Sequence, residues 1–231
     1  MVALLQAGAD ANFGTVTGQM PLQSATMYGH AAVVSLLLQA GALMDEAEFR
    51  GQTVLYTAVH KNHDAVVKLL LEAGADVNRG NNDGATPLMM AAHRGDEAVL
   101  AMLLRAGHPE VDKETKDGIT ALFLAASNGH ASVVAGLLQA GAAVDKPGPW
   151  ITPLMEAARR GHGAVVQALI TGGAKEPREP PDLLSSMIDE VPAEAWAIRG
   201  YVAPLDNPWR RWTYAVEPAR TAFDLSHGAS S

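Results

Sequence analysis

The sequence contains no cysteine, few aromatic residues and no long apolar run, and each absence narrows the class of protein that it can encode. Without cysteine, the chain cannot build a disulfide framework or a zinc site with thiolate ligands, which support many small secreted domains. No segment approaches the ~18 apolar residues that span a bilayer, and no basic segment precedes the short apolar run at the N-terminus. We therefore expect a protein of the cytoplasm or nucleus, with no signal peptide and no transmembrane segment.

The composition predicts an aliphatic core. Only 5 % of the 231 residues are aromatic, whereas 48 % are hydrophobic, and alanine and glycine are abundant. A chain of this length can bury an ample core, and small residues suit thin helices that stack closely. The formal net charge is −8, from 17 Lys and Arg against 25 Asp and Glu. This acidic balance makes nucleic acid an unlikely partner, because nonspecific phosphate binding depends on a net basic surface.

One motif recurs along the chain at a nearly constant interval. It has the form Thr-Pro-Leu-Met-Met-Ala at residues 86–91, and each copy is followed by a second apolar stretch such as the one at 33–38. The leucines of the motif lie 33, 33, 34 and 32 residues apart, at Leu22, Leu55, Leu88, Leu122 and Leu154. A period of this length is typical of repeat proteins.

The third copy has the start and stop signals of two short helices. Thr86 can cap the first helix, Pro87 suits the first helical position, and Gly95 supplies the left-handed turn that ends it. The second helix carries an apolar face over residues 99–104 and ends at Gly107. A single hairpin of this size cannot bury both apolar faces, so the copies must stack on one another.

A module of this length and signature resembles the ankyrin repeat, which consists of two antiparallel helices and a β-turn finger. The resemblance implies an all-α fold, an ankyrin-repeat solenoid of stacked helix-turn-helix units with β-turn fingers. It covers residues 1–174 of the sequence, as a half-repeat at 1–14 and full repeats at 15–47, 48–80, 81–114, 115–146 and 147–174.

The pattern breaks at both ends of the array. Residues 1–8 align with the second helix of a copy, so the half-repeat is either a fragment of a longer array or a small cap. A Pro-rich break at 175–181 precedes a tail at 182–231 that has no repeat. Two short helices, at 182–190 and 193–198, are predicted in this tail. We expect the tail to cap the last repeat; the alternative is a segment that docks a second protein.

The resemblance implies two binding surfaces, of which the first is formed by the finger tips. Phe49, Arg50 and Lys116 flank the turn glycines of their fingers, and Trp150 replaces that glycine in the last copy. Trp150 either anchors a partner or covers the tail.

The second surface is the concave end of each first helix. Its paired positions are Met27-Tyr28, His60-Lys61, His93-Arg94, Ser127-Asn128 and Arg159-Arg160. The cationic members of this set, namely Lys61, Arg94, Arg159 and Arg160 together with His60 and His93, are called the basic ladder. On an acidic chain, the basic ladder could steer an acidic partner. The alternative is that these cations only complement the negative ends of the helix dipoles.

No pattern of a catalytic, cofactor or metal site occurs in the sequence. His60 and His63 lie three residues apart, but Asn62 is expected to break the helix between them. The family's motif histidine is replaced in every copy, and histidines that follow a turn glycine, at 30, 130 and 162, are interpreted as structural. We predict a non-enzymatic module that binds a partner protein. The alternatives are an adaptor whose tail docks a second protein, and a binder of acidic ligands, nucleic acid included.

Overall fold

The computed structural model describes residue 5 and residues 7–15, 19–45, 51–149 and 151–175. Within these residues the chain forms ten helices and no strand. The helices are α2 (Pro21–Met27), α3 (Ala31–Gln39), α4 (Val54–Lys61), α5 (Asp64–Glu72), α6 (Pro87–Arg94), α7 (Glu97–Arg105), α8 (Ala121–Ser127), α9 (Ala131–Gln139), α10 (Pro153–Arg159) and α11 (Gly163–Thr171).

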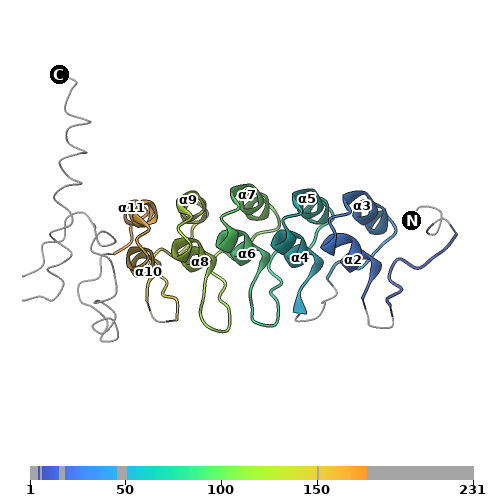
Figure 1. The fold of residues 1–231 in the computed structure, drawn as a ribbon, viewed down its shortest axis with the longest axis horizontal. Helices are drawn as coiled ribbons and strands as arrows, with labels where there is room; N and C mark the ends of the chain where they lie inside the picture. Colours follow the sequence, from blue (N-terminus) through green and yellow to red (C-terminus); the bar gives the residue numbers. More distant parts are fainter. Residues whose placement is uncertain (1–4, 6, 16–18, 46–50, 150, 176–231) are drawn as a thin grey trace, which may run out of the picture.

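The helices form five hairpins that stack side by side (Figure 1). The first helices of the hairpins, α2, α4, α6, α8 and α10, make one layer, and the second helices make the other. The loops between hairpins extend to one side, beyond the layer of first helices. This arrangement confirms the predicted all-α solenoid, while the residue limits of the individual copies stay a prediction.

Threonine side chains begin four of the five first helices. Their Oγ1 atoms accept hydrogen bonds at 3.2 to 3.3 Å from the backbone N–H three residues later; the residues are Thr53, Thr86, Thr120 and Thr152. Helix α6 also has Pro87 in its first turn and ends at Gly95, whose φ is 76°. The cap, the proline and the glycine stop that the sequence predicts for this helix are therefore confirmed.

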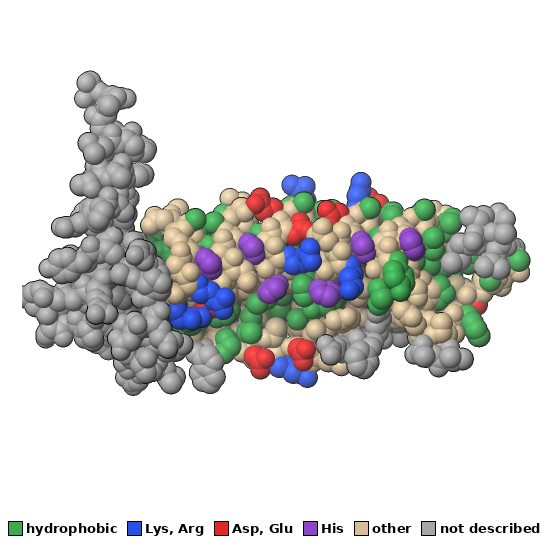
Figure 2. All heavy atoms as spheres, viewed as in Figure 1, with side chains coloured by type: hydrophobic (Ala, Val, Ile, Leu, Met, Phe, Trp, Pro, Cys, Tyr) green, Lys and Arg blue, Asp and Glu red, His purple; other side chains and the backbone are tan. Residues whose placement is uncertain are grey.

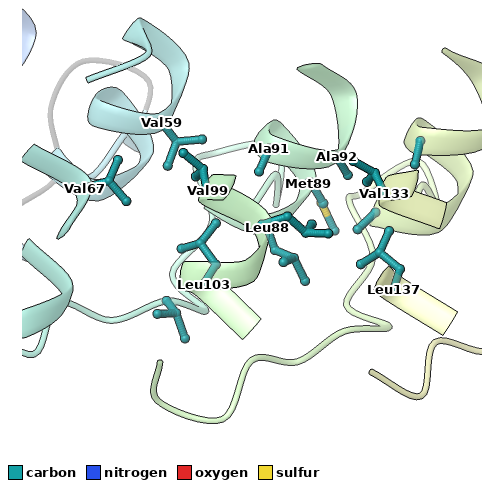
Figure 3. Close-up of a cluster of buried hydrophobic side chains, with 14 of the residues drawn as sticks. Val59, Val67, Leu88, Met89, Ala91, Ala92, Val99, Leu103, Val133 and Leu137 are labelled. Carbon is teal, nitrogen blue, oxygen red and sulfur yellow. The ribbon is translucent and has the colours of Figure 1, made fainter. Parts of the chain in front are cut away.

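The motif leucines form a continuous row in the core, and each is 3 % exposed or less; they are Leu22, Leu55, Leu88, Leu122 and Leu154. Burying one such side chain contributes about 1.5–3 kcal/mol. Figure 3 shows side chains from α4, α6 and α9 pointing into one shared interior, where Ala91 and Ala92 leave room for the neighbouring helices. Each hairpin therefore depends on its neighbours for its hydrophobic core.

The fingers are closed by backbone hydrogen bonds. Asn81 N–H donates to Ala85 C=O at 3.0 Å, and Thr115 N–H donates to Ile119 C=O at 3.0 Å. Neighbouring fingers are also linked, because Lys116 N–H donates to Asp83 C=O at 2.9 Å. These bonds hold the finger of the fourth copy against that of the third.

Several predictions fall outside the described residues. These concern Phe49, Arg50 and Trp150 at the finger tips, most of the Pro-rich break, the first residues of the half-repeat, and the whole tail at 182–231 with its two helices. Among the helices that the structure does describe, none is both long enough and apolar enough to cross a membrane.

Candidate functional site

The basic ladder lies at the C-terminal ends of the first helices. His60 and Lys61 are the last residues of α4, and His93 and Arg94 are the last residues of α6. Both helices stop there because the next residue adopts a left-handed conformation. These four side chains are exposed, and Figure 2 shows His, Lys and Arg side chains gathered along the middle of this face.

The two ends of the same face differ in character. Tyr28 follows the last residue of α2 and is 69 % exposed, and its ring centroid lies 6.2 Å from that of His30. At the other end, Arg159 closes α10 and Arg160 caps it. The face therefore runs from an exposed aromatic residue, through the two His-cation pairs, to a pair of arginines.

Arg94 crosses from the third hairpin to the second. Its Nη1 donates to the backbone carbonyl of His60 at 3.0 Å, and its Nη2 donates to Oδ1 of Asn62 at 2.8 Å. Both acceptors are neutral, so the positive charge of Arg94 remains unbalanced. Sequence reasoning placed Arg94 on this surface but did not foresee that it joins two hairpins.

A buried carboxylate lies beneath the two arginines of α10. The Glu156 side chain is 5 % exposed, and its Oε2 accepts from Arg159 Nε at 2.8 Å. Its Oε1 accepts from Arg159 Nη2 at 2.9 Å, from Arg160 Nε, and from Ser127 Oγ at 3.3 Å. One carboxylate thus balances one of the two guanidinium charges, and it also links α10 to α8.

The charge state of this cluster follows from its geometry. Burial alone would raise the pKa of Glu156, but hydrogen bonds from Arg159 and Arg160 and their charges lower it below its ordinary value. The hydrogen bond to Glu156 raises the pKa of Arg159. Sequence reasoning missed Glu156, although a glutamate followed by arginines three and four residues later is the spacing of an ion pair on a helix.

Lys61 and Arg94 have no such counter-ion among the residues that the structure describes. None of the ion pairs in the described part of the chain involves either residue. The pKa of His60 is lowered, first by partial burial and then by the charges of Lys61 and Arg94. Burial and the two neighbouring positive charges therefore both disfavour the protonated imidazole.

Imidazoles tie three of the described hairpins to their predecessors. His130 Nε2 bonds the carbonyl of His93 at 3.1 Å, and His162 Nε2 bonds that of Ser127 at 3.0 Å, which confirms the structural role predicted for these two histidines. His63 makes the equivalent bond to Met27 at 3.2 Å, which sequence reasoning missed because no glycine precedes it. For His30, the described residues provide no such bond.

The described residues bring no metal site together. His60 belongs to α4 and His63 lies before α5, with Asn62 between them at a φ of 63°, as predicted. In the part of the chain that the structure covers, no group of three or more His, Asp and Glu side chains is arranged to hold a metal ion. Of the predicted finger residues, the structure describes only Lys116, whose side chain is exposed.

The chain matches known family models along most of its length. A model described as ankyrin repeats (3 copies) matches residues 1–81 and 79–148, and a model described as ankyrin repeat matches residues 151–178. A comparison with curated proteins gives no match.

Proposed function

Because the chain belongs to the ankyrin-repeat family, whose repeats generally mediate protein–protein interaction, we propose that it binds a partner protein through the basic ladder and the finger tips, without catalysis. The observation that carries this proposal is the exposed row made by Tyr28, His60, Lys61, His93 and Arg94 on otherwise buried first helices.

The stack supplies the rigidity that such a surface needs. Residues 54–59 of α4 are all buried, so only its last turn is free to reach a partner. Aromatic and arginine side chains are enriched among the residues that dominate binding energy at protein interfaces. Because the helix backbone that carries them is already packed, a partner does not have to order that backbone when it binds. Location in the cytoplasm or nucleus is part of the same proposal, and fluorescence microscopy of the tagged full chain tests it.

Site-specific photo-crosslinking in cells tests whether this surface contacts a partner protein. The identity of the partner need not be known beforehand. Tyr28→p-benzoylphenylalanine and His93→p-benzoylphenylalanine should each yield a discrete adduct of higher mass with one and the same protein. The matched control is Lys68→p-benzoylphenylalanine, because Lys68 is equally exposed but lies on α5, in the layer of second helices. Adducts of equal yield from all three positions would contradict the proposal.

A further inference from the structure

The Lys and Arg residues of the basic ladder form two pairs, Lys61 with Arg94 and Arg159 with Arg160. The pairs differ in how much of their charge is available to a ligand. Arg159 and Arg160 share the carboxylate of Glu156, and the Nε of each arginine donates to it. Their net charge together with Glu156 is therefore one positive unit. Lys61 and Arg94 have no carboxylate partner among the described residues and keep two units.

Arg94 is also held in position for a ligand. A guanidinium has five N–H donors, and two of those of Arg94 are bound to His60 C=O and Asn62 Oδ1. The Nε–H and the second N–H of each Nη remain, and they lie in one plane suited to a carboxylate. Because the two bonds already restrict the side chain, a ligand pays little of the usual entropy of ordering it.

The acidic residues nearest to this pair in the sequence form no ion pair with it. The carboxylate of Asp96 caps α7 by accepting from Val99 N–H at 3.0 Å. Asp64 and Glu97 stand in the first turns of α5 and α7, where the helix dipole favours them, and neither pairs with Lys61 or Arg94. Burial lowers the pKa of His60, and the charges of Lys61 and Arg94 lower it further.

We propose that an acidic segment of the partner protein binds at Lys61 and Arg94, with a carboxylate on the free N–H groups of Arg94, and that Arg159 and Arg160 contribute little to this binding. The inference rests on the proposed function and names the partner chemistry and its anchor. A polypeptide is favoured over nucleic acid because ankyrin repeats generally mediate protein–protein interaction, and because two cations without a carboxylate partner are few for a phosphate backbone, whose binding depends on many cationic contacts.

Binding of a fluorescein-labelled oligoglutamate peptide to the full chain, followed by anisotropy at low ionic strength, tests the assignment. Lys61→Gln removes one charge from a residue with no ion-pair partner in the described structure, and it should weaken binding roughly two- to fivefold, as expected for one exposed ion pair. Arg160→Gln also removes one charge, but it should change affinity less than twofold. Circular dichroism of both variants should match the unsubstituted protein.

Backbone amide resonances give a second measurement that needs no substitution. On titration with the peptide, the largest chemical-shift changes should fall at residues 60–62 and 93–95, with small changes at 159–160. An equal or larger effect of Arg160→Gln, shifts centred on residues 159–160, no peptide binding at low salt, or tighter binding of an oligothymidylate probe would each overturn the inference. If Lys61→Gln leaves the yield of the photo-crosslinked partner unchanged, this inference is also overturned, while the proposed function still stands.

Discussion

The joint between the second and third hairpins differs from the other three joints in the side chain that crosses it. At the other joints an imidazole packs on the turn glycine of the preceding hairpin and bonds a carbonyl two residues before that glycine; the pairs are His63 on Gly29, His130 on Gly95 and His162 on Gly129. At the second-to-third joint, Asn62 and Asp96 replace this pair, and Arg94 bonds the equivalent carbonyl of His60.

Asn62, Asp96 and Arg94 differ from the other copies together, because the imidazole fits only where the turn residue has no side chain. A Cβ on Gly95 would lie 2.4 Å from Nδ1 of His130, so a turn residue with a side chain leaves no space for the ring. Asp96 gains another role in return, since it caps α7, whereas His63, His130 and His162 make no side-chain cap. The comparison teaches that the tie between two repeats can be rebuilt from different residues, but not one residue at a time.

The largest effect is expected from Gly95→Ala. The alanine must adopt a positive φ, and its Cβ displaces the His130 ring, which breaks the ring's hydrogen bond to His93. Together these costs should lower the free energy of unfolding by about 2–4 kcal/mol, measured by urea denaturation followed by circular dichroism.

Gly141→Ala is the matched control for this prediction. Gly141 also has a positive φ, of 90°, but no atom lies within 4 Å of the place that a Cβ on this residue would take. The Gly141→Ala variant should therefore lose only about 1–2 kcal/mol of unfolding free energy, which is the cost of a positive φ at alanine. In a His130→Ala background, the loss in unfolding free energy caused by Gly95→Ala should fall to the same value. An equal loss at both glycines in the unsubstituted background would show that the ring contact has no energetic weight.

A smaller effect is expected from restoring the imidazole pair at the second-to-third joint. Asp96→His removes the cap of α7, and the ring cannot reach its usual place beside Asn62, so about 1–2 kcal/mol should be lost. Adding Asn62→Gly should recover part of this loss. The double-mutant cycle should give a coupling of about 0.5–1.5 kcal/mol. Purely additive values would show that residues 62 and 96 do not depend on each other.

Arg94→Lys tests whether the guanidinium itself ties the second-to-third joint. Lysine keeps the charge but has one donor nitrogen in place of the two that bond His60 C=O and Asn62 Oδ1, so we expect a loss of about 1 kcal/mol in unfolding free energy. Arg105→Lys, at an exposed position in the last turn of α7, is the control and should stay within about 0.5 kcal/mol of the unsubstituted protein. Equal stability of the two variants would show that the bonds of Arg94 add nothing.

The smallest effect concerns the fourth-to-fifth joint, where Glu156 adds a second tie beside His162. Because the pKa of Glu156 is lowered in the folded state, its carboxylate stabilises the protein above the unfolded value of about 4.3, and this contribution is lost as the pH falls through the folded-state pKa. The paired guanidinium side chains are 30 % and 45 % exposed, so solvent screening should keep the effect below about 1 kcal/mol.

Glu156→Gln removes that charge; its carbonyl oxygen can still accept from Arg159 Nη2 and Arg160 Nε, but its NH2 group replaces the oxygen that accepts from Arg159 Nε. Thermal unfolding midpoints of the two proteins should differ at neutral pH and converge as the pH is lowered. A difference that stays constant over the whole range would mean that the carboxylate charge does not contribute.

Much of the architecture could be predicted from the sequence, because its signals are local. The threonine cap and the glycine stop of the third copy each act within one helix, the leucine spacing of 32 to 34 residues repeats the hairpin along the chain, and the structure bears them out. Sequence reasoning also placed the ladder cations at helix C-termini. It did not separate Arg94 from Arg160, although Glu156 lies four residues before Arg160 and no acidic residue stands at the equivalent positions before Arg94.

The sequence by itself therefore determined the repeated helical hairpin and the row of cations at its edge, since helical period and capping are encoded over a few residues. Only the tertiary structure decided which of these side chains connect neighbouring hairpins. Arg94 meets the carbonyl of His60, 34 residues earlier, and Ser127 meets Glu156 across 29 residues, because stacking brings these helix ends side by side. These long-range hydrogen bonds depend on the packing distance between hairpins, which no local pattern specifies.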